Sequence, residues 1–72
     1  MAKRKADPKL VASRLVKLRG IRTRTGVHEE TGISYSLLSK YERGERTPSA
    51  KNQRKLAEYY GVSTDALFYT ID

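Results

Sequence analysis

The stretch GISYSLLSKYERGERTPS, residues 32–49, contains one complete short helix together with its start and stop signals. Ser34 is a good N-cap, because its side-chain oxygen can accept a hydrogen bond from a free backbone amide of the first turn. A helix over residues 35–43 follows, with Leu38 and Tyr41 as its inward i, i+3 pair. A glycine then ends the helix, so the stretch predicts a compact helical unit flanked by turns.

The residues after this stretch predict two further helices. Ser49 is the expected N-cap of a helix over about residues 50–60, which Gly61 ends as a left-handed C-cap. Ser63 is the expected N-cap of a last short helix. Its apolar residues are Leu67, Phe68 and Ile71.

The residues before the stretch predict two helices and an arm. Asp7-Pro8 is a typical helix start, and an apolar stripe of Val11, Leu15 and Leu18 supports a helix of roughly 8–19. A short helix is expected from Thr23 or Thr25 to Glu30. Residues 1–6, MAKRKA, are expected to form a flexible basic arm, and residues 7–72 one domain.

Together these signals predict an all-α fold of five short helices. No alternating strand pattern and no internal repeat occurs in the 72 residues, which allow only one small core. The stretch from Gly32 to Ser49, with Leu56-Ala57 and Gly61-Val62-Ser63-Thr64-Asp65-Ala66-Leu67 after it, resembles the phage-repressor and Cro-type helix-turn-helix family. That resemblance covers about residues 10–68 and implies a five-helix, lambda-repressor-like domain.

The charge distribution independently favours a polyanionic partner. The chain holds 15 Lys and Arg against 8 Asp and Glu, a net charge of +7, and residues 1–24 hold nine of these bases with Asp7 as the one acid. A basic front half on a small domain is typical of nucleic-acid binding, although a solvated basic surface is the alternative.

The resemblance implies that the helix over residues 35–43 enters the DNA major groove and presents its first turn to base edges. The matching positions are Ser34, Tyr35, Ser36 and, one turn on, Lys40. Lys40 can donate to guanine O6 and N7, and the hydroxyl groups can donate or accept.

Phosphate contacts are expected from the helix start before this unit and from the loop after it. They involve Thr23, Arg24, Thr25, Arg43 and Arg46, with Lys3, Arg4 and Lys5 of the arm as further candidates. In similar proteins the Glu of the YERG motif pairs with an Arg near the end of the first helix. The resemblance therefore implies a structural ion pair between Glu42 and Arg19.

The first half of the chain departs from the family pattern. From Arg19 to Gly32 there are 13 residues, about two fewer than usual, and Arg24 lies nearest to the place of a common glutamine. His28 occupies a position usually held by alanine, and we expect a packed or edge residue there. A shorter or displaced second helix follows from this departure.

Enzymatic and metal sites are not expected. The chain has no cysteine and a single histidine, so it lacks a zinc ligand set and a nucleophile–base pair, and no cofactor is expected. No apolar run is long enough for a membrane span or a signal-peptide core, which favours a cytoplasmic protein associated with the nucleoid.

The expected function is sequence-specific binding of double-stranded DNA by a transcriptional regulator, with repression as the expected mode, from a bacterium, phage or mobile element. A homodimer on a two-fold operator is expected, joined through Leu67, Phe68 and Ile71. The alternative is a protein-interaction module, such as an antitoxin, an anti-repressor or a recombination accessory factor.

Overall fold

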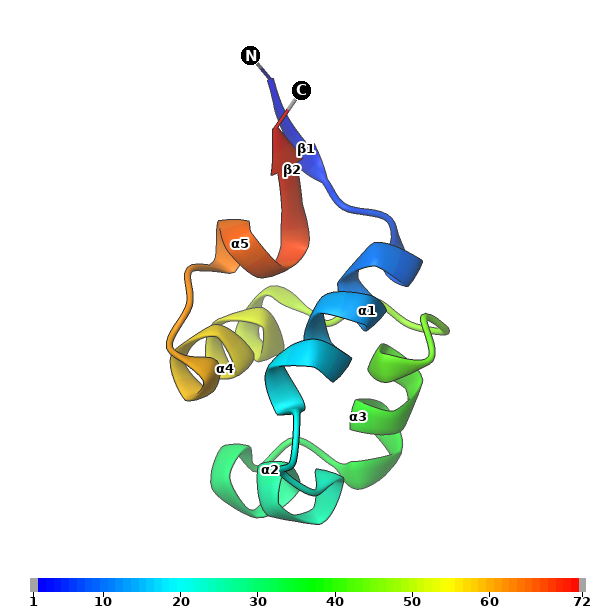
Figure 1. The fold of residues 1–72 in the computed structure, drawn as a ribbon, viewed down its shortest axis with the longest axis vertical. Helices are drawn as coiled ribbons and strands as arrows, with labels where there is room; N and C mark the ends of the chain where they lie inside the picture. The colour runs from blue at the N-terminus through cyan, green and yellow to red at the C-terminus, as the bar shows by residue number, and fades with distance from the viewer. Residues whose placement is uncertain (1, 72) are drawn as a thin grey trace.

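The computed structural model describes residues 2–71, and for Ile71 it describes the backbone alone. Five helices and one two-stranded sheet make up this part of the chain (Figure 1). In chain order the elements are β1 (Lys3–Lys5), α1 (Pro8–Arg19), α2 (Arg24–Thr31), α3 (Tyr35–Glu42), α4 (Ala50–Tyr60), α5 (Thr64–Phe68) and β2 (Tyr69–Ile71).

Each helix begins at a residue whose side-chain oxygen accepts a hydrogen bond from a first-turn amide. The five N-caps are Asp7, Thr23, Ser34, Ser49 and Ser63. Such caps satisfy donors that have no partner within the helix, and each stabilises its helix by about 1 kcal/mol. Four of these caps agree with the expectation from the sequence, and Thr23 is one of the two alternatives for the start of α2.

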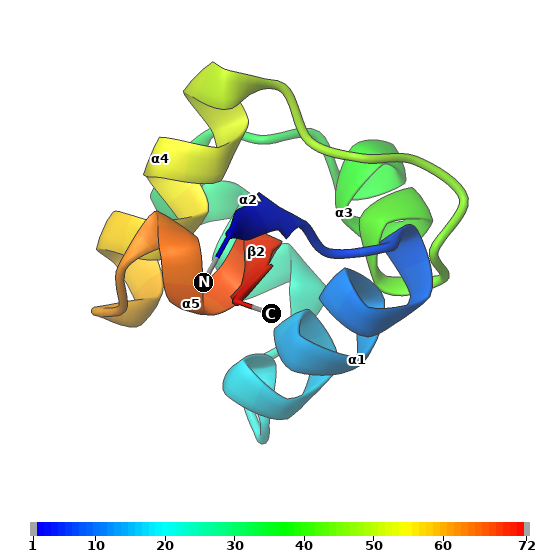
Figure 2. The same ribbon diagram turned by 90° about the horizontal axis from the view of Figure 1, so that it is seen from above.

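The core is built from residues of all five helices. It contains Val11 and Leu15 of α1, Val27 of α2, Leu38 and Tyr41 of α3, Leu56 and Ala57 of α4, and Leu67 and Phe68 of α5. Viewed along the longest axis, α1 and α3 lie on one side of this core and α4 and α5 on the other (Figure 2). The five-helix arrangement expected from the sequence is confirmed, with a small sheet added to it.

The sheet corrects two expectations about the ends of the chain. Lys3–Lys5, expected in a flexible arm, pairs as β1 with β2 in antiparallel register, and Met1 lies outside the described residues. The last helix ends at Phe68, so Ile71 belongs to β2 and not to the helix. Pairing starts where the Ala6 amide donates to the Phe68 carbonyl at 2.9 Å, which joins the first residues of the domain to its last helix.

The sheet extends from one end of the molecule, while α2 lies at the opposite end (Figure 1). The longest dimension of the described chain is 37 Å. The phosphate-contact candidates in β1 therefore lie far from those at the start of α2.

Candidate nucleic-acid interface

The turn between α2 and α3 is fixed by hydrogen bonds on both of its sides. The Thr31 hydroxyl donates to the Val27 carbonyl at 2.7 Å and accepts from the Ile33 amide at 3.2 Å. Gly32 adopts a φ of +77°, a left-handed conformation that favours glycine, and Ile33 fills the core beneath the turn with 3% of its surface exposed. The turn thus sets the angle at which α3 leaves α2.

His28 takes part in the same turn. Its Nδ1 lies 2.6 Å from the Ile33 carbonyl oxygen. A carbonyl oxygen only accepts, so Nδ1 carries the proton and donates. The side chain is half-buried at the edge of the motif, where it ties α2 to the residue before α3.

The four residues expected to face base edges lie on the start and outer surface of α3. Ser34, Tyr35 and Ser36 are exposed, and 48% of the surface of Tyr35 is accessible. Lys40 is half-buried and lies four residues after Ser36, hence on the same face of the helix. The Ser34 oxygen accepts from the Leu37 amide at 3.1 Å, so its hydroxyl proton is the group left to contact a ligand.

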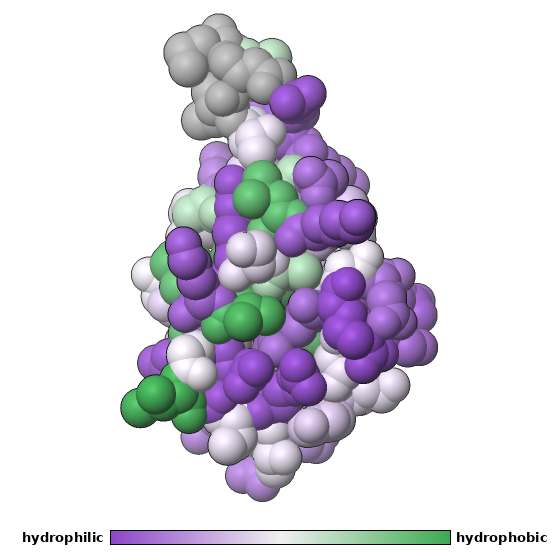
Figure 3. Space-filling view, turned by 45° about the vertical axis from the view of Figure 1, so that its right-hand side comes forward, coloured by the Kyte–Doolittle hydropathy of each residue, from purple (hydrophilic) through white to green (hydrophobic). Residues whose placement is uncertain are grey.

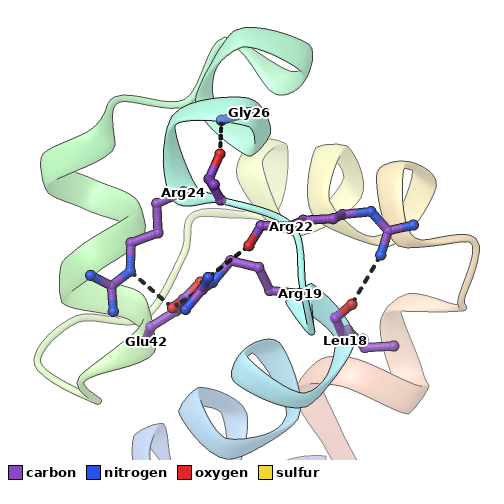
Figure 4. Close-up of polar contacts among 7 residues, drawn as sticks. Leu18, Arg19, Arg22, Arg24, Gly26 and Glu42 are labelled. Carbon is purple, nitrogen blue, oxygen red and sulfur yellow. Dashed lines mark hydrogen bonds and ion pairs between the residues drawn. The ribbon is translucent and has the colours of Figure 1, made fainter.

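Behind this surface, Glu42 at the end of α3 accepts hydrogen bonds from two arginines. Arg19 Nε lies 3.0 Å from Oε1 and 2.9 Å from Oε2, and Arg24 Nε lies 3.0 Å from Oε1. The two guanidinium groups approach the carboxylate from opposite sides (Figure 4). Only 4% of the Glu42 side chain is exposed, against 20% for Arg19 and 32% for Arg24. The cluster joins the end of α1, the start of α2 and the end of α3.

The contact between Arg19 and Glu42 is the one that the resemblance implies, whereas the contact of Arg24 has no signal in the sequence. The Glu42 carboxylate first, and the Tyr35 side chain second, raise the pKa of the Arg24 guanidinium above its ordinary value. The sequence predicts that Arg24 contacts a phosphate; in the structure its Nε donates to Glu42, a carboxylate that it shares with Arg19.

Of the other residues expected to contact phosphates, some form hydrogen bonds or ion pairs within the protein and others are simply exposed. Thr23 uses its oxygen to cap α2 through the Gly26 amide at 3.0 Å, while Thr25 is exposed. Arg43 pairs with Glu45, and that pairing lowers the pKa of the Glu45 carboxyl group. Arg46 is exposed in the loop between α3 and α4.

Two of the three basic residues of β1 make side-chain contacts at the other end of the molecule. Lys3 Nζ lies 3.2 Å from Asp65 Oδ1 and 4.8 Å from the centre of the Tyr69 ring. Arg4 Nε donates to the Thr70 hydroxyl at 3.4 Å, and Lys5 is exposed. The sheet therefore places the side chains of Lys3 and Arg4 against residues of α5 and β2, which a flexible arm would not do.

The expected dimer surface is wrong for two of its three residues. Leu67 and Phe68 have 1% and 2% of their surface exposed, because both pack into the core beneath α1. The side chain of Ile71 lies outside the described residues. The exposed large apolar side chains of the described chain are Val16, Ile21 and Tyr35.

Two further arginines have structural roles that the sequence did not indicate. Arg14 Nη1 donates to the carbonyls of Leu67 and Tyr69, at 3.3 Å and 2.9 Å, and so joins α1 to the junction of α5 and β2. Arg22 donates to the Leu18 carbonyl at 3.2 Å and lies over the rings of Tyr59 and Tyr60. No local signal distinguishes these arginines from the other bases of residues 1–24.

The described residues contain no group of three or more His, Cys, Asp or Glu side chains that could hold a metal ion. Within the same range, every helix is too short or too polar to cross a membrane. The face shown in Figure 3 is mainly hydrophilic, and its apolar side chains form separate patches.

A family model described as helix-turn-helix matches residues 17–67, from the end of α1 to α5. Comparison with curated proteins and with solved structures gave no match.

Proposed function

The chain belongs to the helix-turn-helix family of the Cro and phage-repressor type, a DNA-binding family whose members are typically not enzymes. From this membership we propose that the protein binds double-stranded DNA sequence-specifically and regulates transcription as a repressor, in a bacterium, phage or mobile element. The observation that carries the proposal is the exposed first turn of α3, held by a buried framework inside the matched motif.

In this proposal α3 lies in the major groove and reads bases through its outer surface. Lys40 donates to guanine O6 and N7, while Ser36, Tyr35 and Ser34 use their hydroxyl groups on neighbouring base edges. Thr25, Arg43 and Arg46 contact phosphates on either side, and the free amides at the start of α2 add to them. Lys3, Arg4 and Lys5 contact DNA that flanks the site.

We also propose that two copies occupy a two-fold operator whose half-site centres are about one helical turn, ~10 base pairs, apart. The eight residues of α3 present few base-facing side chains, so one copy reads only a short sequence. A second copy extends the site and raises the effective concentration of each domain.

Selection of bound sites from a random DNA library, followed by gel shifts at several salt concentrations, tests the proposal. We expect a defined motif with inverted symmetry. Lys40→Ala should weaken binding to the selected site far more than to random DNA, since a good base contact contributes roughly 1–3 kcal/mol of discrimination. Lys55→Ala is the matched control, because it removes the same charge from α4 and not from α3. Lys55 lies beside Glu30, Glu58 and Tyr59. A library that yields no motif would refute sequence-specific binding.

A protein-interaction module is the second candidate, favoured by a shallow groove between α1 and α5. Leu18, Val62, Ala66 and Leu67 line this groove, and Arg14 and Lys17 lie at its sides. Phe68, whose exposure would have supported this candidate, is buried and contributes nothing to it. If the selected library shows no enrichment, this groove is the surface to test by substitution of Leu18.

A further inference from the structure

The groove between α1 and α5 has an apolar floor and room for one large side chain. Leu18, Val62, Ala66 and Leu67 form the floor, and the volume of the groove is about 260 Å³. A cavity of roughly 150 Å³ lined by Leu, Ile and Phe already holds a benzene ring. The groove therefore has the size and the lining to take one leucine or aromatic side chain of a partner.

The floor is held in place by the core and by the end of α4. Leu67 has 1% of its surface exposed, and Leu18 and Val62 are half-buried against the core. The Val62 amide donates to the Ala57 carbonyl at 3.0 Å, directly after Gly61, the left-handed C-cap of α4. A surface whose side chains are already fixed loses little conformational freedom when a ligand binds.

The two charged side chains at the sides of the groove are both basic. Arg14 Nη1 donates to the carbonyls of Leu67 and Tyr69, which are neutral groups, so these bonds fix the guanidinium and do not neutralise its charge. Its Nε and Nη2 are left to pair with a carboxylate. Lys17 is exposed three residues further along α1 and lies on the same face of that helix.

These charges distinguish between possible occupants. DNA offers phosphates to the bases but no apolar group to the floor. A second copy of this chain is disfavoured, because two of the three exposed large apolar side chains of the described residues, Val16 and Ile21, are followed by the bases Lys17 and Arg22. The third, Tyr35, lies on the surface proposed to read DNA. An acidic partner, in contrast, meets a complementary charge on a chain of net charge +7.

We propose that this groove binds a segment of another protein in which one large apolar side chain lies between acidic residues. The apolar side chain fills the floor, and the carboxylates pair with Arg14 and Lys17. Lys17 and Arg19 are two residues apart and thus on nearly opposite sides of α1, and Arg19 is the one that contacts Glu42 of α3. The partner therefore leaves α3 uncovered, and the inference goes beyond DNA binding and does not depend on it.

Selection of short random peptides displayed on phage, with the full chain as the target, tests the proposal. Enriched peptides are synthesised, and their Kd is measured by fluorescence anisotropy for the unchanged protein, Lys17→Glu and Ala66→Lys. Ala66 is exposed, so a lysine there extends over the groove without entering the core. Lys51→Glu is the matched control, because it makes the same charge change at an exposed lysine of the first turn of α4, at the other end of that helix from Val62.

We expect the enriched peptides to combine Asp or Glu with Leu, Ile or an aromatic residue. Lys17→Glu and Ala66→Lys should each weaken binding of the best peptide about tenfold, which corresponds to about 1.4 kcal/mol. Lys51→Glu should leave the Kd unchanged. Circular dichroism of all three variants should match that of the unchanged protein, since each substitution is at an exposed position.

Four results would overturn the inference. The first two are a selection without enriched peptides and enriched peptides without acidic residues. The third is equal weakening by Lys17→Glu and Lys51→Glu, which would identify attraction to the net charge alone. The fourth is undiminished binding to Ala66→Lys, which would place the peptide elsewhere on the protein. Failure of the proposed function is distinguishable, because the peptide assay contains no DNA.

Discussion

Replacing Glu42 by Gln should destabilise the domain more than any other single loss of charge in the described chain. Glutamine keeps one oxygen and the shape of the side chain, but it places an amino group where the second carboxylate oxygen faces Arg19. Both Arg19 and Arg24 then lose their only anionic partner in this cluster. The side chain is 4% exposed, so water cannot substitute for the lost charge.

The magnitude follows from the burial of the three groups. Breaking one side of a fully buried ion pair costs about 3–5 kcal/mol, and the partial exposure of both arginines reduces this to roughly 2–4 kcal/mol. A domain of this length is stable by about 4–11 kcal/mol in total, so the loss is a large part of it. It corresponds to a fall in Tm of roughly 10–25 °C.

The assay is urea unfolding followed by circular dichroism, with Glu45→Gln as the matched control. The Glu45 pair with Arg43 has both side chains more than half exposed, and such pairs contribute little to stability because water screens them. Because one carboxylate serves two arginines, Arg19→Met should cost less than Glu42→Gln, and adding it to Glu42→Gln should recover part of the loss. If Glu42→Gln costs no more than Glu45→Gln, the reasoning from burial is wrong.

Three further outcomes are expected. Deletion of residues 2–5 should make the salt dependence of DNA binding shallower by about 0.9 for each phosphate that this strand neutralises, and an unchanged slope would show that β1 does not touch DNA. Burial, with Glu42 as the next cause, raises the pKa of Tyr60 to about 12, above the value near 10 of an unfolded tyrosine. The stabilisation from keeping Tyr60 protonated is complete below pH 10 and is lost as pH rises towards 12, so Tyr60→Phe should flatten the fall in unfolding free energy over that range; an unchanged fall in the variant would contradict this assignment. Leu56→Ala should cost about 2–5 kcal/mol in urea unfolding, because Leu56 is 1% exposed at the centre of the core; a cost below 1 kcal/mol would contradict that placement.

The helices could be predicted from the sequence because the signals that start and end them are local. Each N-cap contacts an amide three residues away, so Ser34 and Ser49 mark helix starts within a few residues of chain. The shorter segment between Arg19 and Gly32 changes only the structure near it, and the contact of α1 with α3 is kept. Here α2 is eight residues long and begins directly after Thr23, and α1 still brings Arg19 to Glu42.

The sheet could not be predicted, because neither strand carries a signal of its own. β1 and β2 have three residues each, too few for an alternating pattern, and their pairing joins residues more than 60 positions apart. The pairing depends on contacts made by the folded domain. Arg14 of α1 donates to the Tyr69 carbonyl, and Lys3 lies over the Tyr69 ring. Only a folded core brings these groups together.

Contacts that form only in the folded domain also explain a second gap. The excess of bases in residues 1–24 indicates a polyanionic partner, but it does not indicate which of these residues contact that partner. Arg14, Arg19, Arg22 and Arg24 all donate to groups within the protein. A net charge draws a polyanion to the molecule whatever these side chains contact, since the field depends on the sum of charges and little on local pairing. Sequence specificity depends instead on the few donors and acceptors that remain directed outward. In this domain, Arg19 and Arg24 add to the general attraction and also build the framework behind α3 through their hydrogen bonds to Glu42.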